Sequence, residues 1–258
     1  NSKKLLLNFD CEITRNNFYS GKNWSNISPI NVDYSLIPTE INKSHTIGKY
    51  YENGNFIGIL NIPIPGLHNL SNITAAIAAS RMIGVDFLEI KKNIKHLKLP
   101  KKRFEFRGQI DERHLYDDYA HHPNEIKETI KLGRLFIKQK HNNECQKSRL
   151  IAIFQPHRYS RVKQFTKEFA EELSKADVIY VTSIYGAGEE NEDRITSKII
   201  TDLIYKKNKN VCYINNYHKI TENFYELTQK GDLILNMGAG DCHDFWSILK
   251  GKKIKTNH

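Results

Sequence analysis

The stretch that decides the fold is HLYDDYAHHPNEI, residues 114–126. It reads as a strand that ends in two carboxylates, Asp117 and Asp118, followed by a short polar loop and a helix that starts at Pro123. Proline is favoured at the first helical position because its missing N–H would have no partner there. Strand-to-helix loops of this kind lie at the carboxyl edge of parallel sheets, where ligands bind. We therefore expect a ligand site at this loop.

The composition is that of an ordinary soluble protein, with 39% hydrophobic and 26% charged residues. The net charge of +10 is compatible with anionic small-molecule ligands or with an ordinary solvated basic surface. The sequence contains no basic stripe of the kind that indicates nucleic-acid binding. No apolar run approaches the roughly 18 residues of a membrane span, and there is no signal peptide. Four widely spaced cysteines favour a reducing compartment. We expect a cytoplasmic protein without a membrane, nucleic-acid or protein partner.

The first hundred or so residues read as short strands followed by helices. Strands are expected at 5–9, 45–51 and 57–62, and helices at 72–82 and 87–97. Asn53-Gly54 marks a hairpin turn, and Asn69 or Ser71 can cap the first helix. The chain starts without a methionine and runs almost at once into a strand, so we expect it to be a piece of something longer.

Beyond a boundary near residues 100–104, strands alternate with helices. The strands are expected at 114–119, 150–155, 178–184, 211–214 and 233–237, with later helices at 196–207, 217–229 and 241–249. Alternation of this kind implies crossover connections and a mostly parallel sheet with helices on both faces. We predict an α/β fold with one domain over 1–101 and a second over 102–258.

Four of these strands end in polar loops. The loops are DDYAHHP (117–123), QPHRYSR (155–161), YGAGEE (185–190) and GAGD (238–241). In a parallel sheet all four fall on the same edge, so they can converge on one crevice. Arg158 and Arg161 stand at the start of a helix that Ser160 can cap, which suits a bound carboxylate or phosphate. The alternative is a pair of ordinary surface arginines.

The residues of these loops leave several roles open. Asp117 and Asp118 could bind a metal, accept hydrogen bonds from ribose hydroxyls, or cap the local turn. His121 and His122 could be ligands, general bases or donors to an anion. The glycines of GAGD could let a ligand approach the backbone, or serve a turn that needs positive φ. Neither the GxGxxG nor the GxxxxGK[ST] motif is present.

Six stretches, in this order, resemble the Mur ligases of peptidoglycan synthesis. They are GLHNLSN (66–72), KKRFEFRG (101–108), DDYAHHPNE (117–125), FQPHRYSR (154–161), YGAGE (185–189) and GAGD (238–241). The resemblance spans the chain but covers only the latter part of such an enzyme. It implies a Rossmann-like C-terminal domain over 102–258, preceded by the last part of a central α/β ATPase domain over 1–101. The phosphate loop and the magnesium ligands are expected upstream, so the chain alone is expected to be inactive.

The resemblance implies an ATP-dependent ligase that joins L-alanine to the lactyl carboxylate of UDP-N-acetylmuramate through an acyl phosphate. ATP and Mg²⁺ are the implied cofactors, and no metal ligand is expected within this chain. Two alternatives stay open. One is a muropeptide-recycling ligase that adds a tripeptide to the same sugar. The other is a metal-dependent phosphohydrolase with Asp117, Asp118, His121, His122 and His157 as ligands.

The resemblance also implies roles for single residues. Catalytic roles fall to Arg103, His121 and His122. The implied ATP-binding residues are His68, Asn69, Asn72, Arg103 and Asp118. The implied substrate-binding residues are Tyr119, His121, Arg158, Arg161, Gly238 and Gly240. In this scheme Arg103 reaches the phosphates and Asp118 the ribose. His121, Arg158 and Arg161 hold the alanine carboxylate. Other Mur ligases carry a lysine where Ala120 stands here, so no lysine role is implied.

Overall fold

The protein is described by a computed structural model that covers residues 5–17, 20–138 and 148–255. It forms two compact units, Asn1–Leu99 and Pro100–His258. The division lies two residues before the boundary expected from the sequence. Of the cysteines, Cys11, Cys212 and Cys242 are free thiols, and Cys145 lies outside the described residues. Among the helices of the described ranges, none combines the length and apolar character needed to cross a membrane.

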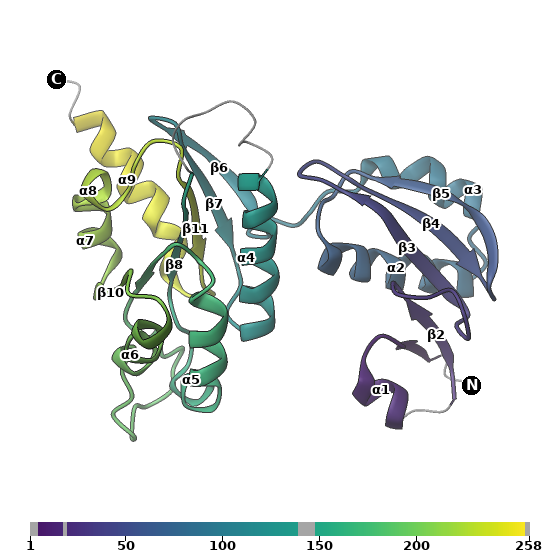
Figure 1. Ribbon diagram of the computed structural model, residues 1–258, viewed down its shortest axis with the longest axis horizontal. Helices are drawn as coiled ribbons and strands as arrows, with labels where there is room; N and C mark the ends of the chain where they lie inside the picture. Colours follow the sequence, from purple (N-terminus) through teal and green to yellow (C-terminus); the bar gives the residue numbers. More distant parts are fainter. Residues whose placement is uncertain (1–4, 18–19, 139–147, 256–258) are drawn as a thin grey trace. The chain divides into compact units, whose positions relative to one another are not determined.

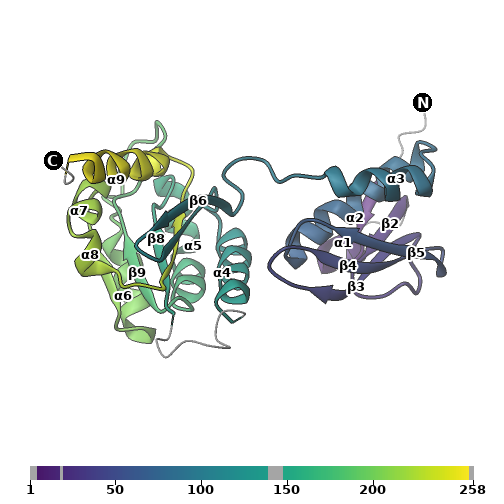
Figure 2. The ribbon, with the colours of Figure 1, turned by 90° about the horizontal axis from the view of Figure 1, so that it is seen from above.

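The first unit is a mixed sheet covered on one face by helices (Figure 2). Its strands, in spatial order, are β1 (Leu6–Asn8), β2 (Lys22–Ser25), β3 (Tyr34–Ile41), β4 (Thr46–Glu52) and β5 (Asn55–Ile62). Strands β1 to β3 run parallel, and β3, β4 and β5 are antiparallel neighbours. The helices are α1 (Glu12–Asn17), α2 (Leu67–Met82), α3 (Phe87–Asn93) and the 3-10 helix η1 (Ile94–His96).

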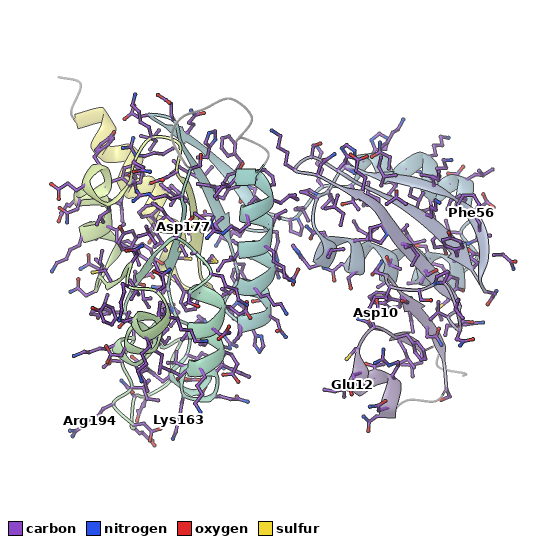
Figure 3. All side chains as sticks on the ribbon, viewed as in Figure 1. Asp10, Glu12, Phe56, Lys163, Asp177 and Arg194 are labelled. Atoms are coloured by element: carbon purple, nitrogen blue, oxygen red, sulfur yellow. The ribbon has the colours of Figure 1, made fainter. Side chains whose placement is uncertain are left out.

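Apolar residues of α2 and α3 form the core of this unit with the inner face of the sheet. Phe87 stacks on Tyr50 with ring centres 5.3 Å apart, and Leu70 and Ile77 join the same cluster. The outer face is more exposed, and Phe56 on the edge strand β5 is 55% exposed (Figure 3). The sheet therefore relies on one helical layer for its apolar core.

Two local predictions in this unit had different outcomes. The hairpin turn is confirmed, because Asn53 and Gly54 join β4 to β5 with φ of 47° and 79°. Helix α2 begins at Leu67, five residues before the expected start. Gly66 precedes it with φ 95°, which turns the chain directly into the helix. Asn69 does not cap the helix, since its side-chain amide donates to the Pro65 carbonyl from within the first turn (2.7 Å).

The second unit has a six-stranded sheet in the order β10-β9-β8-β11-β7-β6 (Figure 1). Its strands are β6 (Glu105–Ile110), β7 (Arg113–Asp118), β8 (Leu150–Phe154), β9 (Val178–Val181), β10 (Val211–Tyr213) and β11 (Leu233–Met237). All neighbours are parallel except β6 and β7. The mostly parallel sheet predicted from the sequence is confirmed, and β6 is an antiparallel edge strand that was not predicted.

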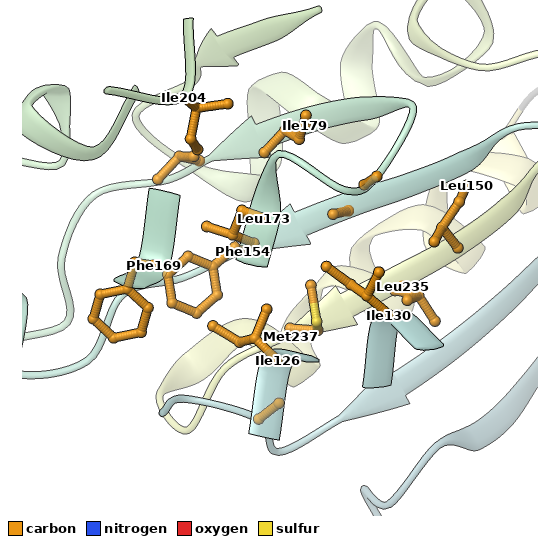
Figure 4. Packing of buried hydrophobic residues seen from close by; sticks show 14 of the residues in the cluster. Ile126, Ile130, Leu150, Phe154, Phe169, Leu173, Ile179, Ile204, Leu235 and Met237 are labelled. Atoms are coloured by element: carbon orange, nitrogen blue, oxygen red, sulfur yellow. The ribbon is translucent and has the colours of Figure 1, made fainter. Parts of the chain in front are cut away.

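Helices cover both faces of this second sheet. On one face lie α4 (Pro123–Lys138), α5 (Tyr159–Leu173) and α6 (Lys198–Lys207), and on the other α7 (Tyr217–Glu222), α8 (Phe224–Leu227), η2 (Asp241–His243) and α9 (Asp244–Lys255). Figure 4 shows the first face, where Ile126 and Ile130 of α4 and Phe169 of α5 pack on Phe154 and Leu235 of the sheet. Sheet and helices therefore bury a continuous core that fixes the strand ends.

One predicted helix is interrupted. The stretch 217–229 forms α7 and α8 instead of a single helix. Asn223, between them, has φ −102° and ψ 21°, and its side-chain amide donates back to the Lys219 carbonyl (3.1 Å). An asparagine that satisfies the backbone in this way competes with helical hydrogen bonding.

Candidate functional site

Four loops meet at the carboxyl edge of the second sheet. The Gly238 N–H donates to the Asp118 carbonyl (3.1 Å), which joins the loops after β11 and β7. The Arg158 N–H donates to the Tyr185 carbonyl (2.8 Å), and His157 forms a parallel bridge with Tyr185, which joins the loops after β8 and β9. The convergence predicted from the sequence is therefore confirmed.

The GAGD loop packs so closely on its neighbours that its glycines are needed. Gly238 has φ 156°, and a Cβ on it would lie 3.1 Å from the Gln155 Cβ. A Cβ on Gly240 would lie 2.6 Å from both Gln155 Oε1 and Tyr185 Cγ. The Gln155 amide also donates to Asp241 Oδ1 (2.5 Å). These contacts explain both glycines by conformation and packing, and the substrate-binding role predicted for them stays a prediction.

The loop after β8 carries a cationic cluster. Arg161 Nη1 lies 3.2 Å from His157 Nδ1, and because a guanidinium only donates, that nitrogen accepts and the imidazole is neutral. The His157 ring stacks on Tyr185 and lies 5.6 Å from the His121 ring, centre to centre. Burial, and then the charges of His121, Arg161 and Arg158, lower the pKa of His157. Such a cluster suits an anionic ligand.

The start of α5 differs from the prediction. Arg158 stands at the N-cap position with φ 69° and ψ 132°, a conformation that costs about 1–3 kcal/mol for a non-glycine residue. Ser160 lies in the first turn, and its N–H and hydroxyl both bond to Glu189 (3.0 and 2.7 Å). Those bonds lower the pKa of Glu189. The carboxylate that stabilises this helix N-terminus is therefore supplied by the YGAGEE loop.

The first carboxylate at the end of β7 is structural. Asp117 Oδ1 accepts hydrogen bonds from the Asn236 amide (2.9 Å) and the Trp246 indole, and Oδ2 lies 3.6 Å from Arg107 Nε. Asn236 is on β11 and Trp246 on α9, so this carboxylate joins three elements. Burial raises the pKa of Asp117, and the two hydrogen bonds oppose that rise. The contacts support the structural alternative for this residue.

The second carboxylate, Asp118, is also buried. Its Oδ2 accepts from the Phe104 N–H (2.9 Å) and its Oδ1 from the Ala120 N–H (2.8 Å). Burial raises the pKa of Asp118 to about 6, and these backbone bonds keep it from rising further. The side chain thereby attaches the segment around Phe104 to the DDYAHHP loop. The Thr129 side chain also bonds to this carboxylate, so the predicted ribose role would use the lone pair of Asp118 that these bonds leave free.

Arg103 and His121 lie on either side of a third carboxylate, that of Glu125. Arg103 Nη1 is 3.7 Å from Glu125 Oε1, and its guanidinium carbon is 5.9 Å from the centre of the Tyr119 ring. His121 Nδ1 donates to the Tyr119 carbonyl (2.8 Å), and the two rings are 5.1 Å apart. The structure thus brings together three of the residues predicted to act at the site.

His122 points elsewhere. Its ring packs edge-on against Phe165 of α5 with centres 4.8 Å apart, and its carbonyl accepts the Ile126 N–H at the start of α4. Helix α4 begins at Pro123, as predicted. The His122 ring therefore packs against the neighbouring helix α5, whereas the His121 ring packs against His157. Its predicted catalytic role stays a prediction.

The residues proposed for a metal do not assemble. In the part of the chain that the structure describes, no three His, Cys, Asp or Glu side chains are arranged to hold a metal ion. Asp117 and Asp118 face inward, and His122 packs on Phe165. The geometry gives no support to the phosphohydrolase alternative.

The other predicted ATP-binding residues belong to the first unit. His68, Asn69 and Asn72 lie in the first two turns of α2. Asn69 is buried and bonded to the Pro65 carbonyl, whereas Asn72 is exposed and His68 is half-buried. Of the three, Asn72 is the most accessible to a ligand.

Comparison with known proteins decides the family. The model of the Mur ligase glutamate ligase domain matches residues 102–240. This chain belongs to the Mur ligase family. A UDP-N-acetylmuramate–L-alanine ligase of Prochlorococcus marinus subsp. pastoris is 64% identical over 258 residues, which are 100% of this chain and 54% of that protein. A ligase of the same name from another strain of Prochlorococcus marinus is 45% identical, over 98% of this chain and 53% of its own length.

The chain therefore spans about half the length of the curated Mur ligases that it matches. Among solved structures, the UDP-N-acetylmuramate–alanine ligase of Thermotoga maritima matches with a TM-score of 0.71 at 21% identity, over 92% of this chain and 48% of that one. The MurF ligase of Thermotoga maritima in complex with ADP matches with a TM-score of 0.67 at 16% identity, over 100% and 55%. These likenesses confirm the Mur ligase fold.

Two site residues of this Mur ligase chain had no role predicted from the sequence. Glu125 stands three positions after His122 and bonds back to its N–H (3.2 Å), as the acid of a capping box does. That spacing was a local signal which could have revealed it. Glu189 contacts Ser160 across 29 residues, and no local pattern indicates such a contact.

Proposed function

We propose that this chain serves in a ligase that uses ATP to join L-alanine to the lactyl carboxylate of UDP-N-acetylmuramate. The observation that carries the proposal is the cluster of Arg158, Arg161 and His157 where four loops meet. Two guanidinium groups beside a neutral imidazole suit the carboxylate of an incoming amino acid. The name of the relative at 64% identity supports alanine as that amino acid. The reaction would take place in the cytoplasm, on small-molecule substrates.

The reaction would proceed in two steps. The lactyl carboxylate takes the γ-phosphoryl group of ATP, which gives an acyl phosphate and ADP. The amine of alanine then attacks the acyl carbon, and the tetrahedral intermediate collapses with loss of phosphate. By holding the carboxylate of alanine, the loop cluster orients the amine toward the acyl carbon, and orientation of this kind can supply several kcal/mol of catalysis.

His121 would hold the carboxylate of alanine together with Arg158 and Arg161, whereas the residues predicted for ATP would serve the nucleotide. Arg103 would neutralise phosphate charge, and Asp118 would accept hydrogen bonds from the ribose. His68 and Asn72 would contact the adenine, and Asn69 would belong to the same ATP-binding set. Mg²⁺ would accompany ATP and screen its phosphates, but the described residues assemble no site for it. The phosphate loop is also missing from this sequence, so we propose that the 258-residue chain is inactive alone.

Alanine-dependent phosphate release tests this proposal. The protein would carry this sequence at the full length of its relatives and would be given ATP, Mg²⁺ and UDP-N-acetylmuramate. We expect release with L-alanine and little with a tripeptide acceptor, while the 258-residue chain alone should release none. Release only with the tripeptide would move the protein to the recycling ligases. Hydrolysis of simple phosphate esters without either acceptor would refute the ligase assignment.

A further inference from the structure

The carboxylate of Glu125 touches two groups that are proposed to serve different substrates. Its Oε2 accepts the backbone N–H of His121 (3.0 Å) and of His122 (3.2 Å), and lies 3.4 Å from the His121 ring nitrogen Nδ1. Its Oε1 faces Arg103 Nη1 at 3.7 Å. One side chain thus contacts the arginine proposed for phosphate and the histidine proposed for the acceptor.

The contacts also keep this carboxylate charged and fixed in place. Burial opposes its ionisation, but the N–H of His121, the charges of His121 and Arg103, and the N–H of His122 together lower the pKa of Glu125. The two N–H groups belong to the residues just before α4, and the carboxylate bonds back to them from the first turn of that helix. If the side chain moved away, both N–H groups would lose their acceptor. A fixed negative charge therefore lies between the Arg103 guanidinium and the His121 ring.

The backbone around Arg103 is held separately from its side chain. The Tyr119 N–H donates to the Lys102 carbonyl (2.7 Å), and the Phe104 N–H donates to Asp118 (2.9 Å). Lys102 and Phe104 both have positive φ, 60° and 45°. The segment is thus anchored on either side of Arg103, whose side chain is 44% exposed. Within the described residues, Glu125 is the acidic side chain that forms an ion pair with this guanidinium.

We propose that Glu125 is a positioning residue that couples the phosphate-facing Arg103 to the acceptor-facing His121. The inference rests on the proposed ligase function. Glu125 contacts neither substrate in this scheme. It holds two substrate-binding groups in one arrangement, so that loss of its charge weakens the binding of ATP and of alanine together.

The test compares Glu125→Gln with Glu125→Ala in the full-length ligase. Glutamine keeps an oxygen for the two backbone N–H groups but loses the charge, so it separates positioning from helix capping. We expect Glu125→Gln to raise the KM for ATP and the KM for alanine about tenfold each, as loss of a charged hydrogen-bond partner does. Glu125→Ala should raise both further and also lower the melting temperature.

Glu128→Gln is the matched control. Glu128 lies on the same helix and pairs with Lys131 (2.7 Å), outside the loop cluster, so both KM values should stay within about twofold. If Glu125→Gln leaves both KM values unchanged, or raises only one of them, the coupling is refuted. The unsubstituted enzyme is assayed first. If it lacks alanine-dependent activity, the proposed function itself is refuted, and not only the coupling through Glu125.

Discussion

Replacing Arg158 by alanine is expected to raise the KM for alanine about 100-fold, while the KM for ATP stays within about twofold. Hydrogen bonds to charged groups contribute about 1.5–3 kcal/mol, and each 1.4 kcal/mol corresponds to tenfold. Arg158 is available for a ligand, since its side chain is 50% exposed and its ion pair with Glu189 is long (3.8 Å). Steady-state kinetics of the full-length ligase, with each substrate varied in turn, measures both constants.

Lys163→Ala is the control for this substitution. Lys163 lies further along α5, and its ammonium pairs with Asp193 (2.8 Å) at the outer end of the unit, near Arg194 (Figure 3). Its removal should leave both KM values within about twofold, because exposed ion pairs contribute little. Equal increases in the two KM values for Arg158→Ala would contradict a carboxylate-binding role.

Replacing Asp117 by alanine is expected to lower the free energy of unfolding of the second unit by about 3 kcal/mol. The substitution removes the buried acceptor of the Trp246 indole and one of the two acceptors of the Asn236 amide, which keeps its bond to the Cys242 carbonyl. Leaving a buried donor unsatisfied costs about 1–3 kcal/mol, and more where a charged partner is lost. Urea denaturation of the 258-residue chain, followed by tryptophan fluorescence and circular dichroism, measures the change.

Asp193→Ala serves as the comparison for Asp117→Ala. Asp193 is an exposed acid in the loop before α6, so its removal should change the free energy of unfolding by less than about 0.5 kcal/mol. Asp117→Asn should fall between the two, because its amide oxygen can still accept one of the hydrogen bonds. An Asp117→Ala variant as stable as Asp193→Ala would show that the carboxylate is not a structural tie.

The parallel core of the fold could be predicted because its signals are local. Buried strands such as β8 and β11 are short apolar runs that end in polar loops, and the structure places them within a residue of the predicted bounds. Strand β3 was missed because Pro38 lies inside it, and proline argues against a strand unless a bulge accommodates it. The register of β3 shifts between Pro38 and Glu40, which is such a bulge.

Strand β6 was missed for a similar reason. Its sequence directly follows the expected domain boundary, and its pairing with β7 is interrupted between Phe106 and Gly108. An edge strand with a bulge and few buried side chains leaves little periodicity to detect. Strand β6 is defined by its antiparallel pairing with β7, which the local sequence does not reveal.

In the candidate site, too, features set by local sequence could be predicted, whereas contacts between distant residues could not. The four loops and their charged residues could be recognised from the sequence, because strand ends in a parallel sheet share one edge. The partners of those residues could not. Trp246 meets Asp117 across 129 residues, and Glu189 takes the capping position predicted for Ser160. Both contacts depend on packing between elements that only the folded chain brings together.

The most direct test of the account compares L-alanine with L-alaninamide as acceptors in the full-length ligase. Alaninamide keeps the methyl group and the attacking amine but lacks the carboxylate that Arg158, Arg161 and His157 are proposed to hold. At matched concentrations of free amine, kcat/KM for alaninamide should be about 100-fold lower than for alanine. Most of that difference should disappear in Arg158→Ala. Equal kcat/KM for the two acceptors in the unsubstituted enzyme would contradict the proposal that these loops bind the carboxylate of the amino acid.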